Sequence, residues 1–332
     1  MFSVIEMIEY WLPETVLDNH QLERKFPEWN SNRIEKKVGI RERHIAGENE
    51  TASDLAYEAA IKLFKGYDKN KIDFLLLCTQ SPDYFFPSSA CLLQSRLMLS
   101  DTVGALDYNL GCSGFIYGLA LSKGLIRAGI ASHVLLLTAE TYSKHLHPQD
   151  LANRSIFGDG AAATVVSKVD QEHIYEFEFG TDGNGKDNLI VANGGLRNKY
   201  NHDESTAVGG TEFMRSDNYL YMNGPEIFNF TIEKIPLLVE NTLRKNKMSL
   251  NDIHYVIFHQ ANKYMLTYLR KKMKIPENKF FMNMEHTGNT VSATIPIALK
   301  ESLCQGIVKK GDIVLLVGFG VGYSWGATVV KI

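Results

Sequence analysis

Short apolar runs alternate with amphipathic stretches along the chain, and this alternation constrains the fold more than any other feature. The apolar runs are nearly unbroken sequences of Val, Leu and Ile, which is typical of strands covered on both faces. The strand–helix rhythm predicts an α/β fold with mainly parallel strands. The predicted strands are 72–78, 134–138, 161–166, 255–259, 313–318 and 327–330, and the predicted helices are 51–64, 88–99, 113–128, 227–246, 263–273 and 291–305.

A weak internal repeat suggests two similar halves. In each half an apolar strand is followed by a polar pair that ends in glutamine, Thr79–Gln80 in one and His259–Gln260 in the other. Both halves close on a glycine-rich segment and the sequence Ala-Thr-Val-Val, at 163–166 and 327–330. We therefore expect a first domain over residues 1–170 and a second over 171–332. A polar, glycine-rich insertion at 181–223 is expected to form loops or a lid.

The composition is that of an ordinary globular protein. The chain has 332 residues, 45% of them hydrophobic and 22% charged, and its net charge of −3 gives no case for nucleic acid or membrane as a partner. No run approaches the ~20 apolar residues of a membrane-spanning helix. The four cysteines are widely separated and form no Cys-x-x-Cys pair. This spacing argues against a disulfide framework and is consistent with a reducing cytoplasm.

Cys112 is the strongest candidate for catalysis. It lies in Gly-Cys-Ser-Gly at 111–114, between an extended run and the helix predicted at 113–128. Free N–H groups and the helix dipole favour a thiolate at such a position, and the same N–H groups can bind an oxyanion. A buried structural thiol is the competing interpretation, and it fits Cys78, Cys91 and Cys304. Local sequence alone leaves both interpretations of Cys112 open.

Two further segments contain side chains that a cysteine nucleophile needs. His259 ends a predicted strand, and Asn289 lies in the turn sequence His-Thr-Gly-Asn-Thr at 286–290, ahead of the last long helix. Taken singly, they are an ordinary strand-end histidine and a turn asparagine. Together with Cys112 they supply hydrogen-bond donors for a carbonyl that becomes an enolate. This combination predicts an enzyme that carries an acyl group on sulfur.

Other motifs point away from nucleotides and metals. The glycine-rich segment at 318–326 lacks the Lys-Ser/Thr of a phosphate loop and precedes a strand, so we interpret it as a turn that presents a backbone N–H. His145 and His147 have no acidic or cysteine cluster beside them, so no metal site is expected. The helix predicted at 263–273 contains several basic residues. They form either a solvated face or a surface that attracts an acidic partner.

The ordered motifs resemble those of β-ketoacyl-acyl-carrier-protein synthase III, a family of thiolase-like condensing enzymes. The similarity covers nearly the whole chain, and several motifs in order are far more specific than any one of them. They are GIRERHI at 39–45, NET at 49–51, FPS at 86–88, GCSGF at 111–115, FGDG at 157–160, HQAN at 259–262, GNT at 288–290 and GYSWG at 322–326.

The resemblance implies a five-layered α-β-α-β-α fold of two similar halves, assembled as a homodimer. It implies that Cys112 is acylated, that His259 and Asn289 are its partners, and that the backbone N–H groups of Cys112 and Val321 bind the oxyanion. The implied reaction is a decarboxylative Claisen condensation of the acyl-cysteine with malonyl-acyl carrier protein, which yields a 3-oxoacyl thioester. The substrates are thioesters of coenzyme A or acyl carrier protein, and no metal or other cofactor is implied.

The resemblance also implies roles for residues outside the centre of the site. Lys271 and Lys272 match basic positions that dock acidic carrier proteins, and Lys263 lies on the same predicted helix. Phe86 matches a residue that reaches into the partner's acyl pocket in the family dimer.

Three positions depart from the pattern of the fatty-acid starter enzymes. Arg33 stands where those enzymes have a tryptophan that stacks on the adenine of coenzyme A, and Trp29 is offset nearby. Leu151 replaces an arginine, with Arg154 shifted by three residues. Val321 replaces a glycine, which keeps the N–H but adds a β-branched side chain. The expected donor is therefore an acyl carrier protein, or coenzyme A held differently.

Two other functions stay open at this point. An enzyme of the same fold could transfer its acyl group to an amine or hydroxyl in a specialised pathway, such as surface-sugar or secondary-metabolite synthesis. The altered coenzyme A positions and the polar insertion motivate that alternative. A catalytically dead scaffold that binds carrier protein is the third hypothesis, and the intact Cys-His-Asn set argues against it.

Overall fold

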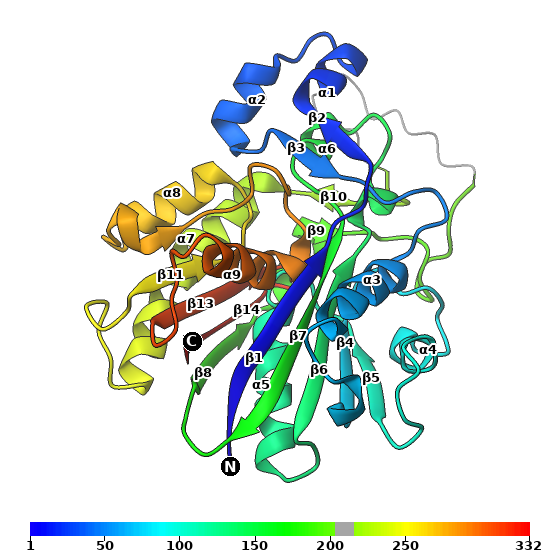
Figure 1. The fold of residues 1–332 in the computed structure, drawn as a ribbon. Helices are drawn as coiled ribbons and strands as arrows, with labels where there is room; N and C mark the ends of the chain where they lie inside the picture. Colours follow the sequence, from blue (N-terminus) through cyan, green and yellow to red (C-terminus); the bar gives the residue numbers. More distant parts are fainter. Residues whose placement is uncertain (203–215) are drawn as a thin grey trace.

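Two five-stranded sheets stack with helices between and outside them (Figure 1). The computed structural model describes residues 1–202 and 216–332. The strands are β1 (Phe2–Trp11), β2 (Val16–Asp18), β3 (Glu42–His44), β4 (Phe74–Cys78), β5 (Gly104–Tyr108), β6 (His133–Glu140), β7 (Gly160–Val169), β8 (Ile174–Thr181), β9 (Leu189–Ile190), β10 (Tyr221–Met222), β11 (Tyr255–Phe258), β12 (Phe280–Phe281), β13 (Ile313–Gly320) and β14 (Ser324–Lys331). The α-helices are α1 (Asn19–Lys25), α2 (Ser31–Val38), α3 (Ala52–Phe64), α4 (Ser89–Arg96), α5 (Gly114–Arg127), α6 (Leu151–Arg154), α7 (Gly224–Lys245), α8 (Lys263–Lys272) and α9 (Thr294–Cys304).

The two sheets repeat one topology. The first has the order β1-β7-β6-β4-β5, and the second, read in the same sense, has the order β8-β14-β13-β11-β12. Strand directions match position by position. β7 and β14, which contain the repeated Ala-Thr-Val-Val, occupy equivalent places. The prediction of two similar halves is confirmed.

Strand alternation explains the five layers. On β4, Leu75 and Leu77 pack against the outer helices α3 and α4, whereas Leu76 points to the central layer. On β13, Leu315 faces the outer helices α7 and α8, and Leu316 faces the centre. Helices α5 and α9 lie between the sheets and contact strands of both. Both faces of each sheet are covered, as the unbroken apolar runs predicted.

The prediction of mainly parallel strands is wrong. β4 is parallel to β5 and β6, but β7 is antiparallel to both β6 and β1, and the second sheet repeats this mixture. A central strand is apolar on both faces whichever way it runs, so its sequence does not encode its direction. β1 and β8, at the sheet edges, were not predicted as strands.

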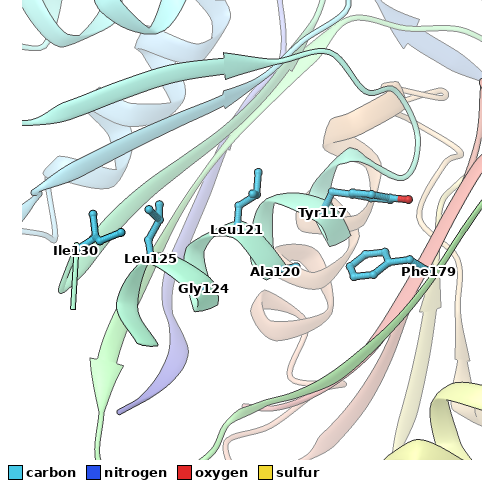
Figure 2. Close-up of a pocket in the computed structure, with 7 residues that line it drawn as sticks. All are labelled: Tyr117, Ala120, Leu121, Gly124, Leu125, Ile130 and Phe179. Atoms are coloured by element: carbon cyan, nitrogen blue, oxygen red, sulfur yellow. The ribbon is translucent and has the colours of Figure 1, made fainter. Parts of the chain in front are cut away.

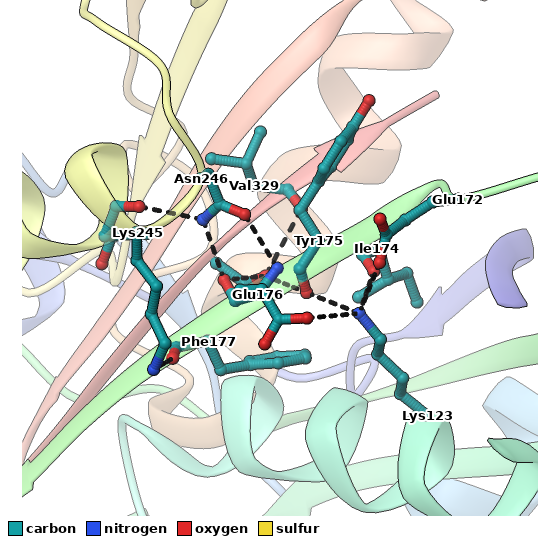
Figure 3. Close-up of polar contacts among 11 residues, drawn as sticks. Lys123, Glu172, Ile174, Tyr175, Glu176, Phe177, Lys245, Asn246 and Val329 are labelled. Atoms are coloured by element: carbon teal, nitrogen blue, oxygen red, sulfur yellow. Dashed lines mark hydrogen bonds and ion pairs between the residues drawn. The ribbon is translucent and has the colours of Figure 1, made fainter.

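The chain passes from the first sheet to the second between Val169 and Ile174. There Lys123 of α5 binds the incoming segment, with its Nζ 3.0 Å from Glu172 Oε1 and 2.6 Å from the carbonyl oxygen of Ile174 (Figure 3). The division at residue 170 stays a prediction. Of the expected insertion at 181–223, the structure describes β9 and β10 and their flanks, while 203–215 lie outside the described residues. In the described part of the chain, no helix is long and apolar enough to cross a membrane.

Candidate active site

Cys112 lies in the tight turn between β5 and α5. The N–H of Gly114 donates to the carbonyl of Gly111 at 2.8 Å, and Cys112 is only 6% exposed. A Cβ placed on Gly320 would lie 2.8 Å from Cys112 Sγ, so the end of β13 packs directly against the thiol. The structure therefore places Cys112 at a helix start, as predicted, with its sulfur against the second half of the chain.

The protonation of Cys112 differs from the expectation of a stabilised thiolate. Burial and, as a smaller effect, the nearby carboxyl group of Glu140 raise the pKa of the thiol to about 12. The backbone N–H groups of Val321 and Cys112 interact with the sulfur and lower its pKa, but they do not offset the burial. The isolated site holds a protonated thiol, so the nucleophile needs a base.

His259 follows β11 and is held through its backbone and through one ring nitrogen. Its backbone N–H donates to Val317 at 2.8 Å, and its Nδ1 lies 2.7 Å from Thr294 Oγ1. Thr294 Oγ1 donates to the carbonyl of Val291 at 3.0 Å, so it accepts the proton of His259 Nδ1 and leaves a lone pair on Nε2. Burial lowers the pKa of His259 to about 3, so the ring is neutral at pH 7.

Asn289 presents its amide group to the same ring. Its Nδ2 lies 3.5 Å from His259 Nε2, while its Oδ1 accepts a hydrogen bond from the N–H of Val291 at 2.9 Å. The latter bond fixes the orientation of the amide, so the NH₂ group faces the histidine. Val291 adopts φ of 55°, a conformation rare for a β-branched residue and typical of functional turns.

The repeated topology brings these residues together. Cys112 precedes α5 and Asn289 precedes α9, and these are equivalent central helices of the two halves. His259 follows β11, and Thr79 follows the equivalent strand β4. Cys112 and Val291 belong to one buried cluster, with Val321 packed against it. The structure thus places Cys112 against Val321 and Val291, and Val291 belongs to the turn in which Asn289 lies beside His259.

Glu140 is a buried carboxyl group beside this site that the sequence interpretation did not single out. It is fully buried at the end of β6 and accepts hydrogen bonds from the N–H of Gln80 at 3.0 Å and from Ser292 Oγ at 2.9 Å. Burial raises its pKa to about 8 despite these hydrogen bonds. Its position as a charged residue at the end of an unbroken apolar strand was the signal that could have found it.

Tyr142 and Thr294 were also missed. Tyr142 is buried next to Cys112 in the cluster, and Thr294 is the first residue of α9. Each lies in a segment with an ordinary sequence, and only the fold brings it to the thiol or the histidine. Nothing in either segment distinguishes it from a core residue.

The predicted peripheral residues lie away from the thiol. Phe86 is 86% exposed in a loop with Tyr84 and Phe85, which are 61% and 77% exposed. Lys263, Lys271 and Lys272 are exposed on α8. Leu151 is buried in α6, so it cannot stack on an incoming ligand, and Arg154 is half-buried. The side chain of Arg33 lies outside the described residues.

Comparisons with known proteins agree along the whole chain. Residues 106–183 match the family model 3-oxoacyl-[acyl-carrier-protein] synthase III, and residues 243–332 match the model of its C-terminal part. A β-ketoacyl-[acyl-carrier-protein] synthase III of Clostridium tetani is 36% identical over 97% of this chain and 96% of its own. A crystal structure of a 3-oxoacyl-(acyl-carrier-protein) synthase III is 48% identical, with a TM-score of 0.98 and full coverage of both chains.

A second solved structure, from Burkholderia xenovorans, is 33% identical with a TM-score of 0.92 and covers 100% of this chain and 94% of its own. The chain belongs to the 3-oxoacyl-[acyl-carrier-protein] synthase III family, the thiolase-like enzymes that condense an acyl thioester with malonyl-acyl carrier protein.

Proposed function

We propose that Cys112 is the residue that carries the acyl group in this condensation, with His259 as its base. The neutral His259 has a lone pair on Nε2, because its Nδ1 proton is bound by Thr294. The thiol proton passes to Nε2, the sulfur attacks the donor thioester, and the donor thiolate leaves and takes a proton from solvent, so that Nε2 keeps its proton for the second stage. The N–H groups of Cys112 and Val321, which already interact with the sulfur, bind the oxyanion of the tetrahedral intermediate.

In the second stage the malonyl thioester loses CO₂, and its thioester carbonyl becomes an enolate. The Nδ2 of Asn289 and the protonated Nε2 of His259, 3.5 Å apart, are placed to donate to one oxygen between them. The enolate carbon attacks the acyl carbonyl, the carbon–sulfur bond to Cys112 breaks, and the sulfur takes up a proton. The product is the 3-oxoacyl thioester. The single observation that carries this assignment is the fixed, buried pairing of His259 with Asn289 beside Cys112.

The two stages can be tested separately by intact mass spectrometry and by CO₂ release. We expect Cys112→Ala to form no acyl-enzyme with any donor. We expect Asn289→Ala to be acylated but to release CO₂ about 10²–10³-fold more slowly, the usual cost of losing one donor to an oxyanion. Cys91→Ala, which removes an exposed thiol, is the matched control and should behave as the parent. Product from the Cys112→Ala enzyme would disprove the assignment.

The alternative function, transfer of the acyl group to an amine or hydroxyl, makes a different prediction in the same experiment. It requires product without a malonyl unit and without CO₂. The family match favours condensation, because the matched proteins are synthases of 3-oxoacyl thioesters by name.

We also propose that the carrier protein docks on α8. Lys263 and Lys271 are exposed, and no ion pair within the described residues involves either of them. Lys263 begins the helix three residues after Gln260, so this surface is close to the base in sequence. Between the lysines, Tyr264 is 60% exposed and its ring packs 5.5 Å from that of Phe228 on α7. Lysines around an aromatic residue suit an acidic partner with an apolar centre.

Homodimer formation is the other partner proposal. β5 is the last strand of the first sheet, and its Leu106 is 39% exposed. Beside it, the outer face of α5 and the ring of Phe179 line an apolar hollow of about 450 Å³, in which Leu121 is 43% exposed (Figure 2). An edge strand and an apolar helix face side by side favour self-association. Phe86, exposed in a neighbouring loop, would then be available to the second copy.

A cytoplasmic location completes the proposal. The mechanism depends on a free thiol at Cys112, and all four cysteines are unpaired. A reducing compartment preserves that state.

A further inference from the structure

Glu140 is a fully buried carboxyl group that has no cation as a partner among the described residues. Its three hydrogen-bond donors are neutral: the N–H of Gln80 at 3.0 Å, the hydroxyl of Ser81 at 3.3 Å and the hydroxyl of Ser292 at 2.9 Å. An apolar side chain would fill such a place at less cost in free energy if packing were its only role. We therefore looked for the role of this carboxyl group in the segments that its donors belong to.

The donors of Glu140 come from both halves of the chain. Gln80 and Ser81 follow β4 in the first half, whereas Ser292 lies in the second, in the short turn between Asn289 and α9. Oε2 of Glu140 accepts from the two donors of the first half, and Oε1 accepts from Ser292. One carboxyl group thus fastens the turn after Asn289 to the strand ends of the first sheet.

That turn sets the direction of the Asn289 amide group, because the N–H of Val291 donates to Asn289 Oδ1 at 2.9 Å. Val291 has φ of 55°, which is unfavourable for a β-branched residue and persists only where the surroundings hold it. Thr294 Oγ1 holds the carbonyl of Val291 at 3.0 Å, and Glu140 holds the next side chain along, that of Ser292. Loss of the Glu140 contact would remove one of these restraints on the turn.

The backbone of Asn289 is anchored separately. Its N–H donates to the carbonyl of Ile156 at 2.9 Å, and its carbonyl accepts from the N–H of Gly158 at 3.1 Å. A loosened turn would therefore leave the backbone of Asn289 in place and free its side chain to rotate. The expected defect is one of orientation, confined to the step that uses the amide group.

We propose that Glu140 is a positioning residue for the decarboxylation step, and that it holds the Asn289 amide group through Ser292 and Val291. This inference rests on the proposed role of Asn289 as a donor to the enolate oxygen. Acylation of Cys112 does not use that donor, so a misdirected amide should slow CO₂ release far more than acylation.

Ser292→Ala removes the link on the side of the asparagine. The enzyme is first acylated with an acetyl, butyryl or octanoyl donor, on coenzyme A or carrier protein, and intact mass gives the rate. CO₂ release is then measured in a single turnover with malonyl-acyl carrier protein. We expect CO₂ release to slow about 10- to 100-fold, and by at least about 10-fold more than acylation.

Ser302→Ala is the matched control. Ser302 is also fully buried and lies on α9, but its hydroxyl donates to the carbonyl of Leu299 in the same helix, at 2.7 Å. Its loss removes a buried hydroxyl without releasing the turn that follows Asn289. Ser302→Ala should release CO₂ at the parent rate.

Substitutions of Glu140 separate its position from its charge. Glu140→Leu removes both acceptors and should slow CO₂ release, and adding Ser292→Ala to it should change the rate by less than about 2-fold, since the link is already broken. Glu140→Gln keeps the link, because its amide oxygen can accept from Gln80 and Ser81 while its NH₂ group donates to the hydroxyl of Ser292. Glu140→Gln should therefore release CO₂ at close to the parent rate.

Three results would overturn the inference. They are CO₂ release from Ser292→Ala as fast as from Ser302→Ala, equal slowing of acylation and CO₂ release in Ser292→Ala, and release from Glu140→Gln as slow as from Glu140→Leu. Thermal unfolding establishes that each variant is folded, and Ser292→Ala covers the case in which Glu140→Leu is not. A parent that no donor acylates at Cys112, or an Asn289→Ala enzyme that releases CO₂ at the parent rate, would instead contradict the proposed function.

Discussion

At the scale of single residues, Thr294 controls where the proton of His259 resides. Its hydroxyl accepts from Nδ1 and donates to Val291, which keeps Nε2 free as a base. In Thr294→Val the Nδ1 proton loses this acceptor, so the ring is no longer held in that tautomer. We expect acylation of Cys112 to slow about 10- to 100-fold, the cost of leaving one buried group unpaired.

The readout for Thr294 separates a positioning role from a structural one. Acylation should fall more than CO₂ release, because only the first stage needs a lone pair on Nε2. Thr294→Ser, which keeps the hydroxyl, should restore acylation. Equal losses in both stages, without rescue by serine, would show that Thr294 only supports the fold.

Glu140 is predicted to make both reactivity and stability depend on pH. Its folded pKa of about 8 lies above the ordinary carboxyl value of 4.5, so the folded state binds the extra proton between those two values. Its contribution to stability is therefore fully present below pH 4.5 and is lost as the pH rises through 8. Glu140→Gln should show a smaller fall in melting temperature between pH 6 and 9.

The same substitution should activate the thiol, because the Glu140 charge raises the pKa of Cys112. Iodoacetamide reacts with the thiolate, so we expect faster alkylation of Cys112 in Glu140→Gln above pH 8 than in the parent. Glu240→Gln, at an exposed position of α7, is the control for the loss of one charge. Identical pH profiles for the parent and Glu140→Gln would contradict the coupling.

These residues also mark the limit of the sequence interpretation. Cys112, His259 and Asn289 were identifiable because each lies where an element begins or ends, in a motif with unusual glycines or polar residues. Thr294 and Tyr142 were not identifiable, because their contacts with His259 and Gln80 join residues more than 30 positions apart in the chain. Glu140 could be identified as a charged residue at the end of an apolar run, but the sequence does not show that Gln80 and Ser292 are its hydrogen-bond donors.

At the scale of elements, α8 is predicted to control carrier-protein binding alone. Lys271→Glu should raise KM for malonyl-acyl carrier protein about 10-fold at low salt, with a smaller effect at high salt, because exposed charges are screened. Acylation of Cys112 by a coenzyme A donor should be unchanged, since the thiol is not on this helix. Lys310→Glu, at the opposite end of β13 from Val321, is the control. An equal effect on both donors would argue against docking at α8.

The elements show how far periodicity alone can predict a fold. The helix predicted at 113–128 is observed as Gly114–Arg127, because its apolar spacing and flanking glycines define both ends. β1 escaped prediction because charged residues such as Glu6 and Glu9 interrupt its apolar side chains. Glu9 forms an ion pair with Lys300 of α9, with 2.6 Å between Oε1 and Nζ. This pairing offsets the cost of a charged residue in the strand, and the local sequence does not reveal it. The direction of the strands could not be predicted either, because it is set by the connections between strands and not by their composition.

At the scale of the whole molecule, Lys123 ties the two halves together. Its Nζ binds Glu172, Ile174 and Tyr175, where the chain enters the second sheet, while its own helix packs between both sheets (Figure 3). Lys123→Met would leave two carbonyls without their donor, so we expect a loss of about 2–4 kcal/mol in the free energy of unfolding by urea. Lys186→Met, which removes an exposed pair with Asp187, should change it by less than about 0.5 kcal/mol. If Lys123→Met and Lys186→Met changed the free energy of unfolding equally, the buried contacts of Lys123 would contribute nothing to stability.

The proposed homodimer gives the last prediction, which concerns the apolar surface of α5. Leu121→Glu places a charge in the hollow beside β5, and a charge in a dry interface is costly to desolvate. We expect the variant to elute as a monomer at micromolar concentration, measured by size-exclusion chromatography with light scattering, while the parent elutes as a dimer. Leu237→Glu on α7, where the leucine is also exposed at 56%, is the matched control and should stay dimeric. Loss of the dimer should also slow acylation if Phe86 of one copy contributes to the site of the other. A monomeric parent, or a dimer that survives Leu121→Glu, would place the interface elsewhere or exclude it.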